Sequence, residues 1–151
     1  MNKDALTSEF LEALTNASRK IRTAFNQRVT AHGLTYPRAR ALLRLSKKPG
    51  MTQSELACEL ELEQATMVRI LDRMEEHGLV ERQPDPKDRR AKLIVLTPRG
   101  TEQAALVTSI GHSMRLEIFA DINSEDIAAG IQLLNKLGER AMLMEDLRDL
   151  T

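Results

Sequence analysis

Residues 52–82 read TQSELACELELEQATMVRILDRMEEHGLVER, and this stretch decides the fold. It opens with a Thr that is followed three residues later by a Glu, which is the pattern of a helix capping box. The Thr52 hydroxyl can accept from the amide of Glu55, and the Glu55 carboxylate can reach back to the amide of Thr52. The pattern predicts a short helix whose apolar side is Leu56, Ala57 and Leu60.

A second helix is predicted after a three-residue turn at residues 61–63. Its apolar residues recur at steps of three and four, the spacing of one helix face, and they are Met67, Ile70, Leu71 and Met74. Gly78 can supply the left-handed residue at which such a helix ends. Two helices joined by a tight turn, the first of them short, predict a helix-turn-helix.

The sequence after this motif predicts a β-hairpin with a long basic tip. Residues 79–82 and 92–96 have the composition of strands, and two prolines keep the loop at residues 83–90 out of a helix. Residues 82–92 hold five basic and two acidic side chains. A helix-turn-helix followed directly by a hairpin is a winged helix. In that fold the second helix enters the major groove of DNA, and the wing reaches a neighbouring minor groove.

Long amphipathic segments flank this winged helix on both sides. The N-terminal segment ends at Gly33, before a helix that Thr35 caps, and its apolar face is Leu6, Phe10, Leu14, Ala17, Ile21, Ala24, Phe25 and Val29. On the C-terminal side, Thr97 caps a helix that has Pro98 at its first position and is expected to run to about Asp121. A final helix is predicted to open at Ser124, with a face made of Ile127, Ile131, Leu134, Leu137, Ala141 and Leu147. One winged helix cannot cover so many apolar positions, so these segments predict an interface between two copies of the chain.

Composition limits the class of protein. Hydrophobic residues make up 42% and charged residues 29% of the 151, as in a folded domain, and no run reaches the ~18 apolar residues of a membrane span. No apolar secretion signal opens the chain, so we expect a cytoplasmic protein. The net charge is zero, but residues 36–99 hold thirteen basic and ten acidic side chains, whereas residues 100–151 hold four and nine. A basic middle beside an acidic tail favours a nucleic-acid surface.

The sequence resembles the multiple antibiotic resistance regulator (MarR) family over most of its length. The resemblance rests on five motifs in order: Thr52-Gln-Ser-Glu-Leu-Ala57, Thr66-Met-Val-Arg-Ile-Leu-Asp-Arg-Met-Glu75, Gly78-Leu-Val-Glu-Arg82, residues 85–91 with the signature Asp88-Arg89-Arg90, and Leu96-Thr-Pro-Arg-Gly100. It implies a homodimeric transcription factor, usually a repressor, that a small phenolic or lipophilic molecule or an oxidant often releases from DNA. It also implies that the first and last helices build the dimer interface.

Two positions depart from the family pattern. Relatives usually begin the second helix of the motif with a capping Ser or Thr, where this chain has Glu63. Val68 occupies a place where a small hydroxyl residue is common, and it can touch a thymine methyl group but cannot hydrogen-bond. We therefore expect an operator that differs from those of closer relatives.

The first set of candidate DNA contacts lies on the second helix of the motif. Gln64, Ala65, Val68, Arg69 and Asp72 stand opposite the apolar stripe. The Gln64 amide can pair bidentately with adenine, and Arg69 can reach guanine or phosphate. Arg73 is a further candidate contact, but an internal salt bridge is the favoured interpretation for this residue. A merely solvated face is the alternative interpretation of the whole set.

The second set of candidate contacts lies on the wing and consists of Lys87, Arg89 and Arg90. One of the two arginines is expected to form a salt bridge with Asp88 that sets the shape of the wing, while the other points at DNA. The sequence does not decide which arginine has which role. Ordinary surface charge is the alternative interpretation.

Other kinds of site are less well supported. The resemblance implies an effector pocket near the junction of the first two helices, where His32, Tyr36 and Arg40 could bind a small aromatic or lipophilic molecule; simple packing is the alternative. Cys58 is the single cysteine and has acidic neighbours in sequence, which disfavours a redox sensor. No histidine spacing indicates a metal, and no nucleophile with a base and an orienting group indicates an enzyme or a cofactor.

These observations predict a mainly α protein with a single MarR-type domain over residues 1–151. Residues 35–99 form a winged helix-turn-helix with a small β-hairpin wing, and residues 1–34 and 100–151 form dimerisation helices. The expected function is sequence-specific transcriptional regulation on double-stranded DNA, as a ligand-responsive repressor that acts as a homodimer on a near-palindromic operator. The alternative is a winged-helix adaptor that binds other proteins and not DNA.

Overall fold

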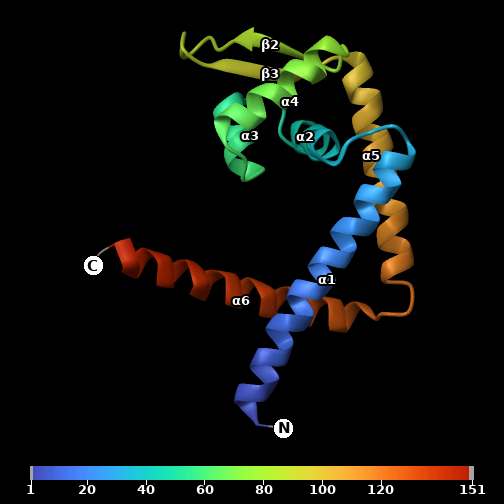
Figure 1. Cartoon of the computed structure of the whole chain (residues 1–151), viewed down its shortest axis with the longest axis vertical. Helices are drawn as coiled ribbons and strands as arrows, with labels where there is room; N and C mark the ends of the chain where they lie inside the picture. Colours follow the sequence, from blue (N-terminus) through green and yellow to red (C-terminus); the bar gives the residue numbers. More distant parts are fainter. Residues whose placement is uncertain (1, 150–151) are drawn as a thin grey trace. The chain divides into compact units, whose positions relative to one another are not determined.

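The mainly helical fold with a small wing is confirmed by the computed structural model, which describes residues 2–149 and side chains up to Glu145 (Figure 1). The elements in chain order are α1 (Lys3–Ala31), α2 (Tyr36–Lys47), β1 (Met51–Thr52), α3 (Gln53–Glu59), α4 (Gln64–Glu76), β2 (Val80–Pro84), β3 (Lys92–Leu96), α5 (Pro98–Ile118) and α6 (Ser124–Asp149). The helix-turn-helix is α3 and α4, and the wing is the hairpin of β2 and β3. The predicted role of Leu147 lies outside the described side chains.

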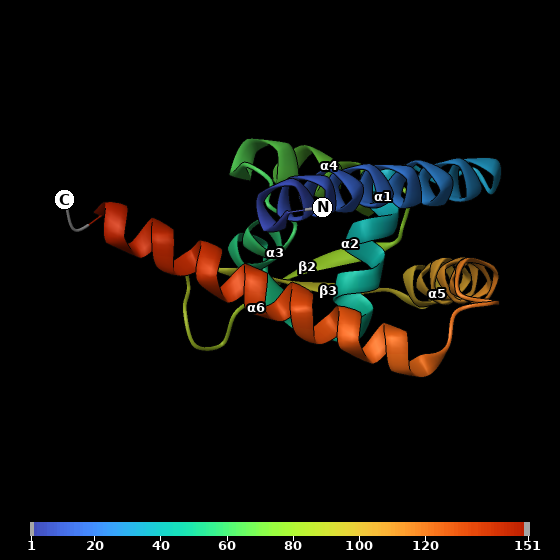
Figure 2. The same cartoon turned by 90° about the horizontal axis from the view of Figure 1, so that it is seen from below.

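The chain divides into two compact units, one reaching to Met114 and the other beginning at Arg115. The first unit contains the whole winged helix-turn-helix together with α1 and most of α5. Its core is built by apolar faces that meet the sheet, and its largest fully buried side chains are Val29, Leu42, Leu56, Leu60, Met67, Leu71, Met74, Leu79, Val80, Ile94 and Val107. Helices α3 and α4 therefore pack on this hydrophobic core. The tip of the hairpin projects beyond them (Figures 1 and 2).

The sheet has three strands, where the sequence predicted only the two of the hairpin. β1 pairs antiparallel with β3, and β3 pairs with β2, so the strand order is β1-β3-β2. Strand β1 has only two residues, too few to leave an alternating pattern in the sequence. Strand β2 also continues to Pro84, two residues beyond its predicted end.

Most of the predicted helix boundaries are confirmed, because caps are local in sequence. The Thr35 hydroxyl accepts from the amide three residues on at 3.3 Å, and the Thr52 hydroxyl does the same for Glu55 at 3.1 Å. Gly33 and Gly78 have φ of +79° and +72°, the left-handed region in which glycine ends a helix. The return half of the capping box differs, since the Thr52 hydroxyl also donates to the Glu55 carboxylate at 3.1 Å.

The end of α5 lies slightly away from its predicted place, whereas the start of α6 is confirmed. Helix α5 ends at Ile118, three residues before Asp121. Helix α6 begins at Ser124, as predicted. Its N-cap is Asn123, whose side-chain oxygen accepts from the amide of Asp126 at 2.8 Å.

Large apolar side chains remain exposed on the long helices of this single chain. On α1, Val29 is buried in the core, but Leu6, Phe10, Leu11 and Ile21 are exposed. The exposed set on α5, α6 and the turn between them is Leu106, Leu116, Phe119, Ile122, Ile131, Leu133, Leu134, Met142, Leu143 and Met144. Exposed apolar surface of this extent is characteristic of a protein interface.

Candidate nucleic-acid interface

Helix α4 presents its predicted contact residues outward. Its inner stripe of Met67, Leu71 and Met74 is fully buried, and this fixes the rotation of the helix about its axis. On the outside, Gln64, Ala65, Arg69 and Arg73 are exposed and Val68 is half-buried. The structure therefore places these five side chains where a ligand in front of the helix could reach them.

The first turn of α4 has no side-chain cap. Glu63 occupies the N-cap position with φ −68° and ψ 151°, and its carboxylate accepts no hydrogen bond from the helix. Ser, Thr, Asp and Asn are the side chains that commonly form such a cap, and Glu is not among them. The amides of the first turn are thus left to solvent or to a ligand, and such amides favour an anion.

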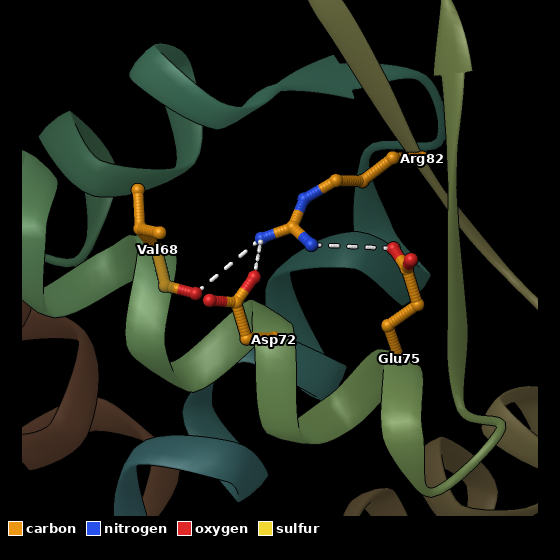
Figure 3. A network of polar contacts seen from close by, with 4 residues as sticks. All are labelled: Val68, Asp72, Glu75 and Arg82. Atoms are coloured by element: carbon orange, nitrogen blue, oxygen red, sulfur yellow. Dashed lines mark hydrogen bonds and ion pairs between the residues drawn. The ribbon is translucent and has the colours of Figure 1, made fainter.

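An arginine from the wing binds the outer side of α4 (Figure 3). The Arg82 guanidinium extends from β2 and forms ion pairs with Asp72 at 2.8 Å and with Glu75 at 3.3 Å. It also donates to the backbone carbonyl of Val68 at 3.3 Å. Only 19% of the Arg82 side chain is exposed, so strand β2 is joined to α4 by a largely enclosed, charge-assisted contact.

Sequence reasoning missed the role of Arg82 and favoured an internal salt bridge at Arg73, which the structure does not bear out. Among the residues that the structure describes, Arg73 has no ion pair and is exposed. The signal that could have identified Arg82 is the pair of acids three residues apart on α4, Asp72 and Glu75, followed by an arginine in the middle of the next strand. Three-residue spacing puts two carboxylates on one side of a helix, where one guanidinium can bind both.

The wing loop is shaped by two aspartates that bind the backbone. The Asp85 carboxylate accepts from the amide of Lys87, and the Asp88 carboxylate accepts from the amide of Arg90, each at 2.9 Å. Asp88 therefore shapes the wing through a turn of the backbone. The expected salt bridge between Asp88 and Arg89 or Arg90 is not present in the described part of the chain, and Lys87 and both arginines are exposed.

The end of α4 and the start of α5 are joined by one threonine and one glycine. The Thr97 hydroxyl donates to the carbonyl of Gly78 at 2.5 Å and accepts from the amide of Gly100 at 3.0 Å. The Thr97 amide donates to the carbonyl of Leu79 at 3.0 Å. Gly100 lies so close to this Leu79 carbonyl that a Cβ atom at position 100 would overlap it. The motif Leu96-Thr-Pro-Arg-Gly100 thus fixes α5 against the segment that follows α4.

A cleft of about 780 Å³ lies between α4 and the start of α2, and Asp72, the partner of Arg82, is among its lining residues. Its lining includes Thr35, Pro37 and Arg38 from the first turn of α2 and Thr66, Arg69 and Arg73 from α4. The volume is that of a site for a small organic molecule. A molecule bound there would contact two of the candidate DNA-contacting arginines.

The three predicted effector residues do not line this cleft. The Tyr36 ring packs edge to face on Phe25, with ring centres 6.0 Å apart, and the Arg40 guanidinium lies 5.7 Å from the centre of the same tyrosine ring. His32 is the C-cap of α1, and its Nδ1 hydrogen-bonds with the carbonyl of Arg28 at 2.9 Å. The structure brings Tyr36 and Arg40 together on one face of α2.

Cys58 is exposed and free on α3. Its neighbour Glu59 is held by Lys48, with Nζ and Oε1 2.6 Å apart. The hydrogen bond and positive charge of Lys48 lower the pKa of the Glu59 carboxyl below its ordinary value, although partial burial opposes the shift. Within residues 2–149 there is no group of three His, Cys, Asp or Glu side chains that could hold a metal, and no helix long and apolar enough to span a membrane.

Comparisons with known proteins agree on the winged domain. The model of the MarR family matches residues 34–92, from just before α2 to the first residue of β3. The structure of transcriptional regulator PA3341 is 34% identical, with a TM-score of 0.80 over 88% of this chain and 98% of that one. The MarR family transcription regulator SP03579 is 22% identical, with a TM-score of 0.85 over 95% of each chain. A MarR family regulator from Listeria monocytogenes, solved in complex with 26mer DNA, is 18% identical, with a TM-score of 0.76 over 86% and 87%.

Proposed function

The chain belongs to the MarR family of transcriptional regulators, and from this premise we propose that it is a ligand-responsive repressor that binds DNA as a homodimer. One observation carries the proposal. A packed winged helix exposes Gln64 and Arg69 on α4, next to a wing whose exposed tip bears Lys87, Arg89 and Arg90. Such a protein acts where the chromosome lies, so its proposed compartment is the cytoplasm.

In the proposed complex, α4 lies in the major groove and the wing follows the neighbouring backbone or minor groove. Gln64 and Arg69 read base edges, and Ala65 and Val68 contribute apolar contacts, for instance with thymine methyl groups. Arg73 and the wing residues bind phosphates, which position the protein without reading sequence. The Listeria monocytogenes relative bound to 26mer DNA supports this arrangement through its shared fold.

The exposed apolar side chains of α1, α5 and α6 support a homodimer. A two-fold axis would place two copies of α4 roughly 34–36 Å apart, which matches a near-palindrome with half-sites one helical turn apart. Sedimentation at micromolar concentration tests this part of the proposal. A stable monomer would contradict it, and Leu134→Glu is expected to convert the dimer into a monomer.

Regulation by a small aromatic or lipophilic molecule is the third part of the proposal. Such a ligand releases DNA only if it binds the DNA-free arrangement more tightly than the bound one. Two sites in the first unit could hold it: the pair Tyr36 and Arg40, and the cleft that Arg38 and Arg69 line. A panel of phenolic acids, scored for release of bound DNA, tests this. Tyr36→Phe combined with Arg40→Ala separates the two sites, because it leaves the cleft lining unchanged.

DNA binding itself is tested by selecting duplexes from a random-sequence pool with the wild-type protein. We expect enrichment of a near-palindrome, and binding that weakens steeply as salt rises, because counterions are released from the phosphates. The rival function is a winged-helix adaptor for other proteins. An adaptor would enrich no sequence and would show no salt-dependent retardation of any duplex.

A further inference from the structure

The helix proposed to enter the major groove carries a net negative charge. Helix α4 holds two arginines and three acids, Asp72, Glu75 and Glu76. The Asp72 side chain is 58% exposed and that of Glu75 is 46% exposed, so neither carboxylate is hidden inside the fold. Carboxylates on such a helix repel the phosphates of DNA unless a cation neutralises them.

The neutralising cation comes from outside the helix. Arg82 belongs to β2, yet its two terminal nitrogens are both engaged by α4: one pairs with Asp72 and the Val68 carbonyl, and the other pairs with Glu75 (Figure 3). An arginine that is 19% exposed and bound in this way has little of its guanidinium left for a phosphate. Its positive charge faces the two carboxylates of α4 and is not available to DNA.

We propose that Arg82 is a positioning residue for DNA binding, which offsets one of the two negative charges of Asp72 and Glu75 and holds the wing at a fixed place beside α4. The inference rests on the proposed DNA-binding function. Arg82 acts through α4 and does not touch DNA, in contrast to Lys87, Arg89 and Arg90, which are exposed at the wing tip. An arginine suits this role better than a lysine, because its planar fork can serve several acceptors at once.

The central test removes the cation and then the acids. Arg82→Met should weaken binding to a mixed-sequence duplex at low salt by about tenfold or more, because two carboxylates then face the phosphates uncompensated. Adding Asp72→Asn and Glu75→Gln to Arg82→Met should restore binding to within about threefold of the wild type, a coupling that a double-mutant cycle measures. If Arg82 served only to hold the wing, removing its partners could not restore binding. An unrestored triple variant would therefore overturn the neutralising role.

A second comparison leaves Arg82 in place, so it does not depend on how well an Arg82 variant folds. Glu76 lies on the same helix but has no ion pair within the described residues, whereas Asp72 is paired with Arg82. Both Glu76→Gln and Asp72→Asn remove one negative charge from α4, but only Asp72→Asn also removes a partner of Arg82. Glu76→Gln should therefore strengthen binding to the mixed-sequence duplex more than Asp72→Asn does. An equal or reversed effect would contradict the proposal.

Two controls complete the design. Lys48→Met removes one positive charge and breaks one ion pair, that with Glu59 of α3, and leaves the acids of α4 and their pairs with Arg82 unchanged. It should bind the duplex much more tightly than Arg82→Met does, and thermal unfolding of each variant reports its folded fraction. If the wild type itself binds no duplex, the proposed function fails. If the wild type binds and Arg82→Met binds equally well, only the role of Arg82 fails.

Discussion

Replacing Gly100 by alanine sets two effects of opposite sign against each other. In the interior of a helix, alanine is favoured over glycine by about 1 kcal/mol. At position 100, however, the new Cβ would overlap the carbonyl oxygen of Leu79, which is backbone and cannot rotate away. Overpacking of this kind costs about 1–3 kcal/mol, and a deep backbone overlap belongs at the upper end of that range. We therefore expect Gly100→Ala to destabilise the fold by about 2 kcal/mol net.

Thermal unfolding at a fixed protein concentration measures this effect. For a chain of this length the expected fall in Tm is about 4–8 °C, at roughly 2–4 °C per kcal/mol. The concentration must be held constant because an associating protein has a concentration-dependent Tm. Thr101→Ala is the matched control, since Thr101 is the next residue on α5 and is exposed; it should leave the Tm unchanged or slightly raised. A Gly100→Ala protein as stable as the wild type would refute the steric argument.

Three further predictions concern DNA contacts, turn strain and acid stability. Gln64→Ala should weaken binding to the selected operator by about 1–3 kcal/mol and leave binding to a scrambled duplex unaffected. Arg90→Ala should weaken binding to both duplexes and lower the slope of log affinity against log salt by about one. An equal loss of affinity on both duplexes for Gln64→Ala would show that Gln64 reads no base. Glu61 has φ +55°, so Glu61→Gly should stabilise the fold by up to about 1 kcal/mol in urea unfolding, and a lower midpoint would contradict this. Lys48 lowers the pKa of the Glu59 carboxyl in the folded state, so the pair stabilises the fold above the ordinary glutamate pKa of 4.5 and loses this effect as the pH falls through the lowered value. Glu59→Gln should therefore reduce the loss of unfolding free energy on the acid side, and a pH profile of stability identical to that of the wild type would contradict this prediction.

The parts of the fold that could be predicted are those encoded by neighbouring residues. Thr35 and Thr52 cap helices through amides three residues on, and Gly33 and Gly78 end helices by their own backbone conformation. The outward residues of α4 follow from its buried stripe at helical spacing. Such features depend on a window of a few residues, so the sequence alone is enough to place them.

The parts that could not be predicted depend on contacts between distant segments. Strand β1 exists because Met51 meets Ile94, 43 positions away, and no local pattern marks it. Arg82 reaches back 14 residues to the Val68 carbonyl, which explains why it was counted only as a basic wing residue. For Asp88 the predicted partner is the guanidinium of Arg89 or Arg90, but the carboxylate accepts from the backbone amide of Arg90, a choice that depends on the conformation of the wing loop.

The hydroxyl of Thr97 gives the two helices on either side of the wing a common fixed point. Its oxygen is bonded at once to the residue that terminates α4 and to the first turn of α5. A rotation of α5 about its first turn must therefore either break a 2.5 Å hydrogen bond or move Gly78, and with it the last turn of α4. A displacement of α5 can therefore reach the end of α4 through Thr97 and its contacts with Gly78 and Leu79, without passing along the strands β2 and β3 that separate these helices in sequence.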